Sequence, residues 1–121
     1  MIQVQTQLKV IDNSGVKKGQ TIKIYQGKHG ALGDIIQISV KQLQSKTKLK
    51  ISKGNIFKAL VVRTKYKYKN LLNNYISFNE NSIILLNNQN VPLASRILGP
   101  IPIQLRKNKQ VKILSLASTI I

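Results

Sequence analysis

Basic side chains at regular spacing are the residues of this sequence with the clearest chemical meaning. They form two rows, and within each row successive basic residues are two positions apart. The first row is Lys46, Lys48 and Lys50, and the second is Arg63, Lys65, Lys67 and Lys69. On an extended strand, residues two apart project to the same side at a repeat of ~6.6 Å, close to the ~6 Å between phosphates along a nucleic-acid strand. Such rows predict contact with a polyanionic backbone.

A single row of lysines has a simpler interpretation, because lysines also solvate strand faces and block strand edges. Two rows with no acid between them favour nucleic acid. Tyr66 and Tyr68 alternate with the lysines of the second row. These tyrosines either stack on sugars or bases or pack against the protein from the inner face of a hairpin, and the sequence leaves both open.

The overall charge also points to a polyanionic partner. The chain has 20 Lys and Arg against 3 Asp and Glu, a formal net charge of +17 over 121 residues. No acid at all lies between Asp34 and Glu80. Such a field repels itself unless a polyanion neutralises it. Since 42% of the residues are hydrophobic, the chain has material for a core and does not resemble a disordered basic tail.

Groups for acid–base catalysis are scarce, and the candidates are Asp12, Asp34, Glu80 and the lone His29. We expect Asp12 to close a turn within IDNSG, Asp34 to lie at a turn or strand edge, and Glu80 to be a solvated loop residue. No cysteine or second histidine accompanies His29, so we expect no metal site. The sequence therefore predicts no enzyme, no cofactor and no small-molecule substrate.

No segment suggests a membrane partner. No stretch approaches the ~20 apolar residues that cross a bilayer, and the basic stretch lacks the helical period of an amphipathic surface helix. The start MIQVQTQLKV lacks the pattern of a targeting segment. We therefore expect the protein to act where it is made.

The basic rows require a β scaffold, and the hydrophobic pattern predicts one. Apolar and polar residues alternate over 21–25, 36–41 and 48–51, as in half-buried strands. The segments 56–62 and 75–86 are richer in consecutive apolar residues, which predicts strands enclosed on both sides or at the interior of a barrel. Five or six strands joined by short turns predict a small antiparallel β-barrel, so the fold class is mainly β.

The pattern changes after Pro92. We expect residues 103–109 to form a short helix, with Pro102 in its first turn and basic residues toward its end. The sequence predicts a single domain over residues 1–121, with the barrel at about 1–90 and short helices or irregular structure at about 91–121.

Six segments in order resemble one known family. They are MIQVQTQLKVIDNSG at the start, GDIIQISVK from Gly33, KGNIFKALVVRTK from Lys53, FNENSIILLNN from Phe78, SRILGPIP from Ser95 and LRKNKQVKILSLAS from Leu105. Together they closely resemble the universal family of large-subunit ribosomal protein fourteen, in its bacterial and organellar form. The resemblance runs from end to end.

The departures from the family pattern concern three segments and Asn55, which stands where the family usually has Asp after the glycine. Leu72-Asn73 stands where the family has an Asp-Gly turn, and asparagine tolerates left-handed geometry. The segment 27–33 is shorter than usual, and the arm 41–53 is slightly longer. These departures, and a composition rich in Asn, Ile and Lys, favour a divergent organellar ribosome. We expect the mitochondrial matrix, with an organelle-encoded chain, ahead of a plastid or a bacterial cytoplasm.

The resemblance implies a closed five-stranded barrel with a projecting hairpin and short C-terminal helices, on the interface side of the large ribosomal subunit. It implies a structural constituent in translation that binds large-subunit rRNA and bridges to small-subunit rRNA. Its neighbours would be ribosomal proteins number nineteen and number three. A docking surface for the ribosome silencing factor would include, by position, Ser95, Arg96 and Lys112.

The residues that we expect to bind rRNA are basic, and they are Lys17, Lys18, Lys41, Lys46, Lys48, Lys50, Lys53, Arg63, Lys65, Lys67, Lys69, Arg106, Lys107 and Lys109. Two other classes stay open beside the ribosomal one. The first is a free, sequence-tolerant nucleic-acid chaperone with a small barrel. The second is an enzyme that acts on RNA, which the scarcity of acids argues against.

Overall fold

The computed structural model describes residues 2–44, 51–69, 72–106 and 111–121. The strands are β1 (Gln7–Val10), β2 (Val16–Ile24), β3 (Ile35–Leu43), β4 (Ile56–Arg63), β5 (Tyr68–Lys69), β6 (Tyr75–Ile76), β7 (Ser82–Leu86), β8 (Ile97–Ile101) and β9 (Ala117–Ile120). The helices are the 3-10 helix η1 (Ile103–Arg106) and the α-helix α1 (Val111–Leu116).

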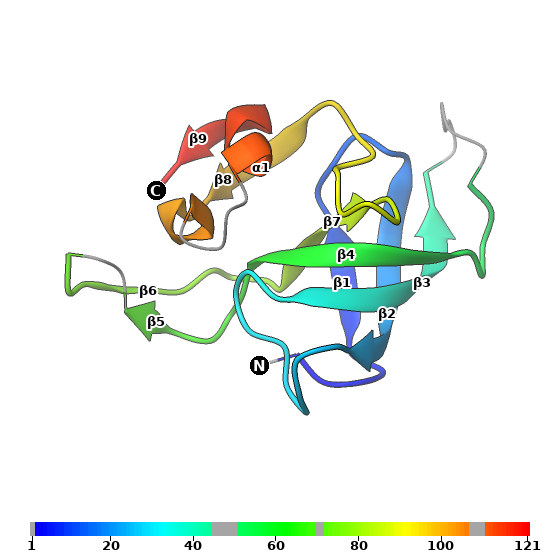
Figure 1. Ribbon diagram of the computed structural model, residues 1–121, viewed down its shortest axis with the longest axis horizontal. Helices are drawn as coiled ribbons and strands as arrows, with labels where there is room; N and C mark the ends of the chain where they lie inside the picture. The colour runs from blue at the N-terminus through cyan, green and yellow to red at the C-terminus, as the bar shows by residue number, and fades with distance from the viewer. Residues whose placement is uncertain (1, 45–50, 70–71, 107–110) are drawn as a thin grey trace.

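Five strands close into a barrel in the order β1-β2-β3-β4-β7, as Figure 1 shows. The predicted closed five-stranded barrel is therefore confirmed. Four of its pairings are antiparallel, but β1 and β7 pair in parallel, with Lys9 opposite Ser82 and Val10 opposite Ile83. The alternation of side chains does not reveal the direction of a partner strand, so the sequence could not predict this parallel seam.

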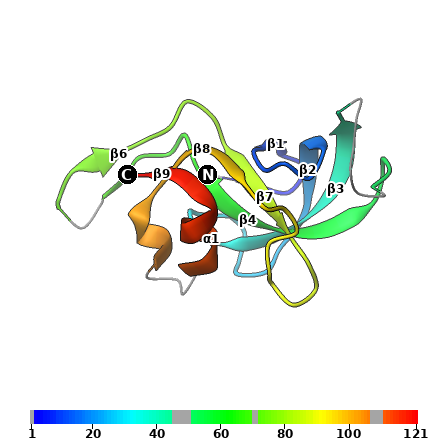
Figure 2. The same ribbon diagram turned by 90° about the horizontal axis from the view of Figure 1, so that it is seen from above.

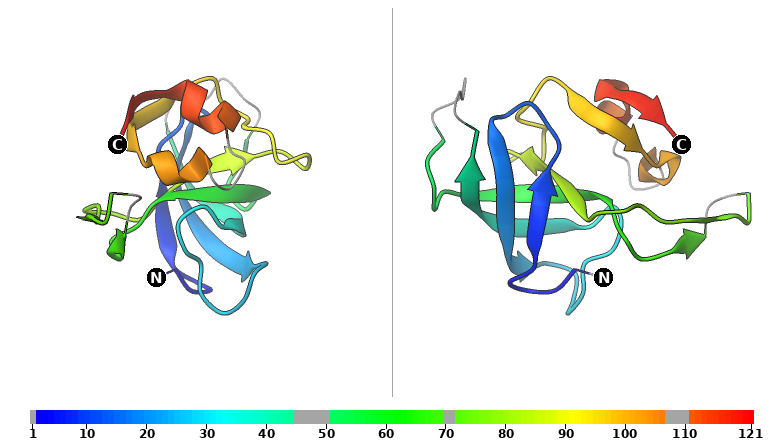
Figure 3. Two further views of the ribbon diagram at one scale, coloured as in Figure 1. Left: turned by 60° about the vertical axis from the view of Figure 1, so that its left-hand side comes forward. Right: turned by 180° about the vertical axis from the view of Figure 1, so that it is seen from behind.

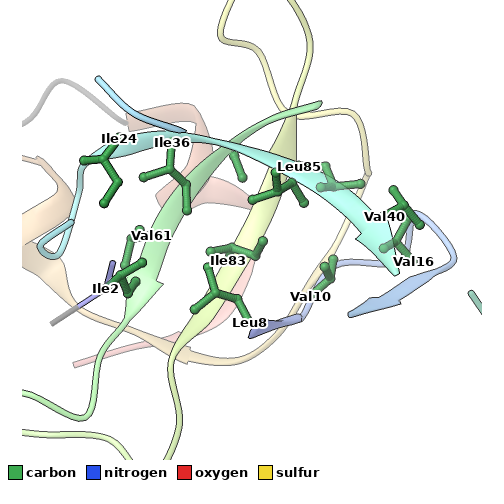
Figure 4. Packing of buried hydrophobic residues seen from close by; sticks show 12 residues of the cluster. Ile2, Leu8, Val10, Val16, Ile24, Ile36, Val40, Val61, Ile83 and Leu85 are labelled. Carbon is green, nitrogen blue, oxygen red and sulfur yellow. The ribbon is translucent and has the colours of Figure 1, made fainter. Parts of the chain in front are cut away.

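The barrel interior is filled by the apolar side of each strand. In β3, Ile36, Ile38 and Val40 are buried while the residues between them are partly exposed, which is the predicted alternation. The close view in Figure 4 shows side chains such as Leu8 and Leu85 converging on the barrel axis from different strands. This cluster fixes the register, because a slip by one residue would turn the apolar set outward.

Strands β4 and β7 are buried on both sides. Their outward-facing residues belong to a second apolar cluster with the C-terminal segment, which covers one side of the barrel in Figure 2. The members of this cluster include Leu60, Val62, Ile84 and Leu86 from the barrel and Ile97, Ile101, Leu105 and Ile113 from the C-terminal segment. Residues 59–62 are covered on both faces, as predicted, whereas Ile56 at the start of the segment is 57% exposed.

The run 75–86, which the sequence predicts as one strand, is two. Tyr75–Ile76 forms β6 and Ser82–Leu86 forms β7, with a turn between them. In that turn the amide of Phe78 donates to the carbonyl of Thr64 at 3.0 Å. Strands β5 and β6 pair as a hairpin that projects from the barrel in Figure 1 and Figure 3. Asn73 has a φ of +65°, so asparagine does hold the left-handed turn.

The C-terminal segment differs from the prediction of helices alone. A helix begins at Ile103, directly after Pro102 as expected, but it is the short η1; its predicted continuation to residue 109 falls outside the described residues. Strands β8 and β9 add a parallel pair that the sequence did not predict. The predicted strand at 48–51 also lies outside the described residues, except for Ile51, which is in no strand.

Asp12 closes the IDNSG turn as predicted and also ties it to the barrel. Its carboxylate accepts hydrogen bonds from the amide and hydroxyl of Ser14 at 3.1 and 2.5 Å and from the amide of Leu85 at 3.0 Å. The side chain is buried. Burial raises the pKa of Asp12 above its ordinary 3.8, and the three hydrogen bonds offset only part of that effect.

The raised pKa of Asp12 predicts a pH dependence of stability. The folded state binds the proton more tightly than the unfolded state, so Asp12 adds stability as pH falls through its folded pKa toward 3.8. We expect the free energy of unfolding of the wild type, relative to that of Asp12→Asn, to increase over this window. Urea denaturation of both proteins across the window measures the difference, in which the charges they share cancel. The prediction would be contradicted if the free energy of unfolding of the wild type, relative to that of Asp12→Asn, decreased as pH falls.

Candidate nucleic-acid interface

All three acids of the chain are engaged within the protein. Besides the buried Asp12, Asp34 accepts a hydrogen bond from the amide of Ala31 at 2.8 Å, at the turn before β3, as predicted. Glu80 lies in a loop but is not merely solvated, which corrects our expectation. Its carboxylate pairs with Arg63 at 3.2 Å and with Lys9 at 3.5 Å. Among the described residues, both ion pairs are at Glu80, so the other described lysines have no carboxylate partner.

Arg63 is directed into the protein. Its guanidinium donates to the carbonyl of Pro100 at 2.9 Å, to the carbonyl of Leu98 and to Glu80, and 11% of its side chain is exposed. Gly99 has a φ of +82°, and a Cβ there would collide with this guanidinium. Burial lowers the pKa of Arg63, and the charge of Glu80 opposes that effect. The structure thus gives Arg63 a role in holding β8 on the barrel, and little of its side chain remains exposed for the predicted contact with rRNA.

The second basic row does not lie on one straight strand, and the prediction is wrong on this point. Strand β4 ends at Arg63 and β5 begins at Tyr68, with a bend between them. The bend forms because the amide of Lys65 donates to Oδ1 of Asn81 at 2.9 Å and the hydroxyl of Thr64 to the carbonyl of Tyr66 at 3.1 Å. The three lysines of the second row nevertheless remain exposed, and they are Lys65, Lys67 and Lys69.

Four lysines line one hollow of about 360 Å³ on the barrel surface, and they are Lys9, Lys17, Lys18 and Lys65. Lys9 and Lys18 lie opposite each other on β1 and β2, and Lys65 comes from the bend after β4. The fold therefore brings three predicted residues together from distant parts of the chain. Sequence reasoning missed Lys9, although its outward position in the alternating QLKV was a usable signal.

The remaining predicted cations are dispersed. Lys41 on β3, Lys53 in the turn before β4 and Arg106 at the end of η1 are exposed. The others lie outside the described residues, and they are Lys46, Lys48, Lys50, Lys107 and Lys109.

Tyr25 is a further feature that the sequence did not indicate. The ammonium groups of Lys23 and Lys58 lie 5.3 and 5.9 Å from the centroid of its ring, which is within the range of a cation–π interaction.

The residues predicted to dock a protein lie on a loop with defined geometry. Oδ1 of Asn13 accepts hydrogen bonds from the amides of Ser95 and Arg96, both at 3.1 Å, and its Nδ2 donates to the hydroxyl of Ser95 at 3.0 Å. Lys112 on α1 lines a groove together with Pro92 and Ala94, so it lies beside the segment that leads into this loop.

Across the described ranges, no group of three His, Cys, Asp or Glu side chains is arranged to hold a metal ion. None of the described helices has the length and apolar character of a membrane-spanning helix.

A small barrel whose acids are bonded internally and whose lysines face outward is typical of proteins that bind RNA. The family model described as Ribosomal protein L14p/L23e matches residues 1–121, the whole chain. The chain belongs to this family, which confirms the resemblance. It is a structural constituent of the large ribosomal subunit that binds rRNA and ribosomal proteins in translation, and it is not an enzyme.

Proposed function

We propose that the exposed lysines hold large-subunit rRNA by its phosphates. The observation that carries this proposal is that the three acids are used within the fold, which leaves the described lysines other than Lys9 without a carboxylate partner. The described residues proposed for the contact are Lys17, Lys18, Lys41, Lys53, Lys65, Lys67, Lys69 and Arg106. Lys46, Lys48, Lys50, Lys107 and Lys109 remain predictions.

Binding of this kind is directed by charge and shape. The edges of the bases in the major groove of A-form RNA are inaccessible, so side chains reach phosphates, 2′-hydroxyls and irregular junctions. Each phosphate neutralised releases a counterion, so affinity falls steeply with salt. Cations on β2, β3, the bend after β4 and η1 would let several RNA segments meet on one small protein.

We also propose a position at the subunit interface, with a bridge to small-subunit rRNA and contacts with ribosomal proteins number nineteen and number three. The loop that carries Ser95 and Arg96, with Lys112 beside it, is proposed as the docking surface for a ribosome silencing factor. Its hydrogen bonds to Asn13 support this assignment, because a preformed loop loses little conformational entropy on binding.

The compartment and the domain organisation are proposals too. The departures at 27–33, 41–53 and Leu72-Asn73 favour a mitochondrial ribosome. A single domain over residues 1–121 is supported by the second apolar cluster, which joins strands of the barrel to β8, η1 and α1.

Sedimentation tests the ribosomal assignment against the free chaperone. We expect the protein to remain with the large subunit when particles are centrifuged through a high-salt gradient, because RNA folded around a ribosomal protein holds it through many simultaneous contacts. Mass spectrometry of the fractions follows it. A chaperone would dissociate and stay near the top of the gradient, and that result would reject the proposal.

A further inference from the structure

We infer that a cleft between the hairpin and the barrel binds one unpaired base of the rRNA. This inference rests on the proposed function and adds to it the class of RNA group that is recognised. The cleft has a volume of about 350 Å³ and is lined by mostly apolar surface, to which Leu32, Thr64, Tyr66, Lys67 and Gln104 contribute. That volume is at the lower end of the ~300–1,000 Å³ of small-ligand sites, so it suits one ring system rather than a stack.

Hydrogen bonds hold the walls of the cleft in place. Nε2 of Gln104, on η1, donates to the carbonyl of Lys69 on β5 at 2.7 Å. The carbonyl of Thr64 accepts from the amide of Phe78 at 3.0 Å, so the two chains at the base of the hairpin are joined. The cleft is therefore formed before any ligand arrives, and binding requires little ordering of the protein.

Two tyrosines give the cleft its aromatic surface. Tyr66 is 60% exposed, far more than packing against the barrel would leave it. Tyr68 is half-buried, and its hydroxyl has no hydrogen-bond partner among the described residues. The hydroxyl oxygen has no exposed surface, so a base in the cleft would contact the ring of Tyr68 and not its hydroxyl.

The charge around the cleft distinguishes a nucleotide from an apolar side chain of a neighbouring protein. Lys67 lines the cleft, and Lys65 and Lys69 flank it in the sequence. None of the described lining residues is an acid. A flat apolar group that carries an anion matches this arrangement, and a base with its phosphate is such a group. Unstacked bases held on aromatic side chains are a common mode of RNA recognition.

Binding measurements over a salt series separate this cleft from the phosphate contacts. We expect Tyr66→Ala to weaken binding to purified large-subunit rRNA on the order of 10-fold at every salt concentration without changing the salt slope, because stacking involves no counterion release. Tyr66→Phe should bind like the wild type. Tyr75→Ala is the matched control, since Tyr75 is 69% exposed on the same hairpin and does not line the cleft; it should bind like the wild type.

Photo-crosslinking identifies the occupant in assembled large subunits. Ultraviolet irradiation followed by mass spectrometry should join Tyr66 or Tyr68 to one nucleotide. That base should become more reactive toward reagents for its Watson–Crick edge in particles carrying Tyr66→Ala. A crosslink to a ribosomal protein instead, or equal weakening by Tyr66→Ala and Tyr75→Ala, would overturn the inference. Failure of the wild type to bind rRNA at all would overturn the proposed function itself.

Discussion

Replacing Lys65, Lys67 and Lys69 together by glutamine is expected to weaken binding to large-subunit rRNA on the order of 100-fold at moderate salt and to lower the salt slope by about two to three. The three lysines are exposed and have no carboxylate partner among the described residues. Each one that meets a phosphate releases about one counterion. Filter binding or fluorescence anisotropy over a salt series gives both quantities.

The matched control removes the same charge elsewhere. Lys23, Lys28 and Lys58 lie outside the proposed contact set, and their triple replacement by glutamine changes the net charge equally. We expect it to have a much smaller effect on the slope, because only local contacts with phosphate release condensed ions. Equal effects of the two triple variants would mean that net charge, and not the surface around the bend after β4, sets the affinity.

Arg63→Ala is expected to lower the free energy of unfolding by about 2 kcal/mol, since it removes the hydrogen bonds of a charged donor to the carbonyls of Leu98 and Pro100, while Glu80 keeps its ion pair with Lys9. The guanidinium joins the end of β4 to the carbonyls of Leu98 and Pro100 and to Glu80. With 11% of the side chain exposed, water replaces these partners poorly. Urea denaturation measures the loss.

Arg63→Lys keeps the charge but not the forked set of donors, so we expect it to recover only part of the stability. The folded fraction of Arg63→Ala should bind rRNA with the same salt slope as the wild type. The triple glutamine variant of Lys65, Lys67 and Lys69 should instead show a lower slope. A variant that is fully stable but has a reduced slope would restore Arg63 to the RNA contacts and remove its structural role.

Much of the barrel could be predicted because the periodicity of apolar residues in the sequence indicates its strands. The alternation over 36–41 and the apolar-rich segment 56–62 correspond to β3 and β4, and the left-handed turn at Asn73 followed from residue type. The break between β6 and β7 could not be predicted, since it depends on the bond between Phe78 and Thr64, residues of different segments. Pairing of β8 with β9 is equally a product of tertiary packing.

The candidate site was predicted as a set of charges but not as a geometry. The sequence identifies a lysine or arginine without revealing what its side chain contacts. Spacing therefore groups Arg63 with Lys65 and Lys67, although its guanidinium donates to two carbonyls of β8. The hollow that gathers Lys9, Lys17 and Lys18 exists only once β1 and β2 have paired. The two alternatives for Tyr66 and Tyr68 likewise required the position of the hairpin relative to the barrel.

The parallel seam between β1 and β7 has a consequence for biogenesis. The first strand finds its second neighbour only after residues near Ile83 have left the peptide exit tunnel, and contacts between such distant positions form slowly. Until then the sheet of the nascent chain has two unpaired edges, and its hydrophobic core is incomplete. Newly made copies should therefore depend on chaperoning, or on early capture by the assembling particle, during most of their own synthesis.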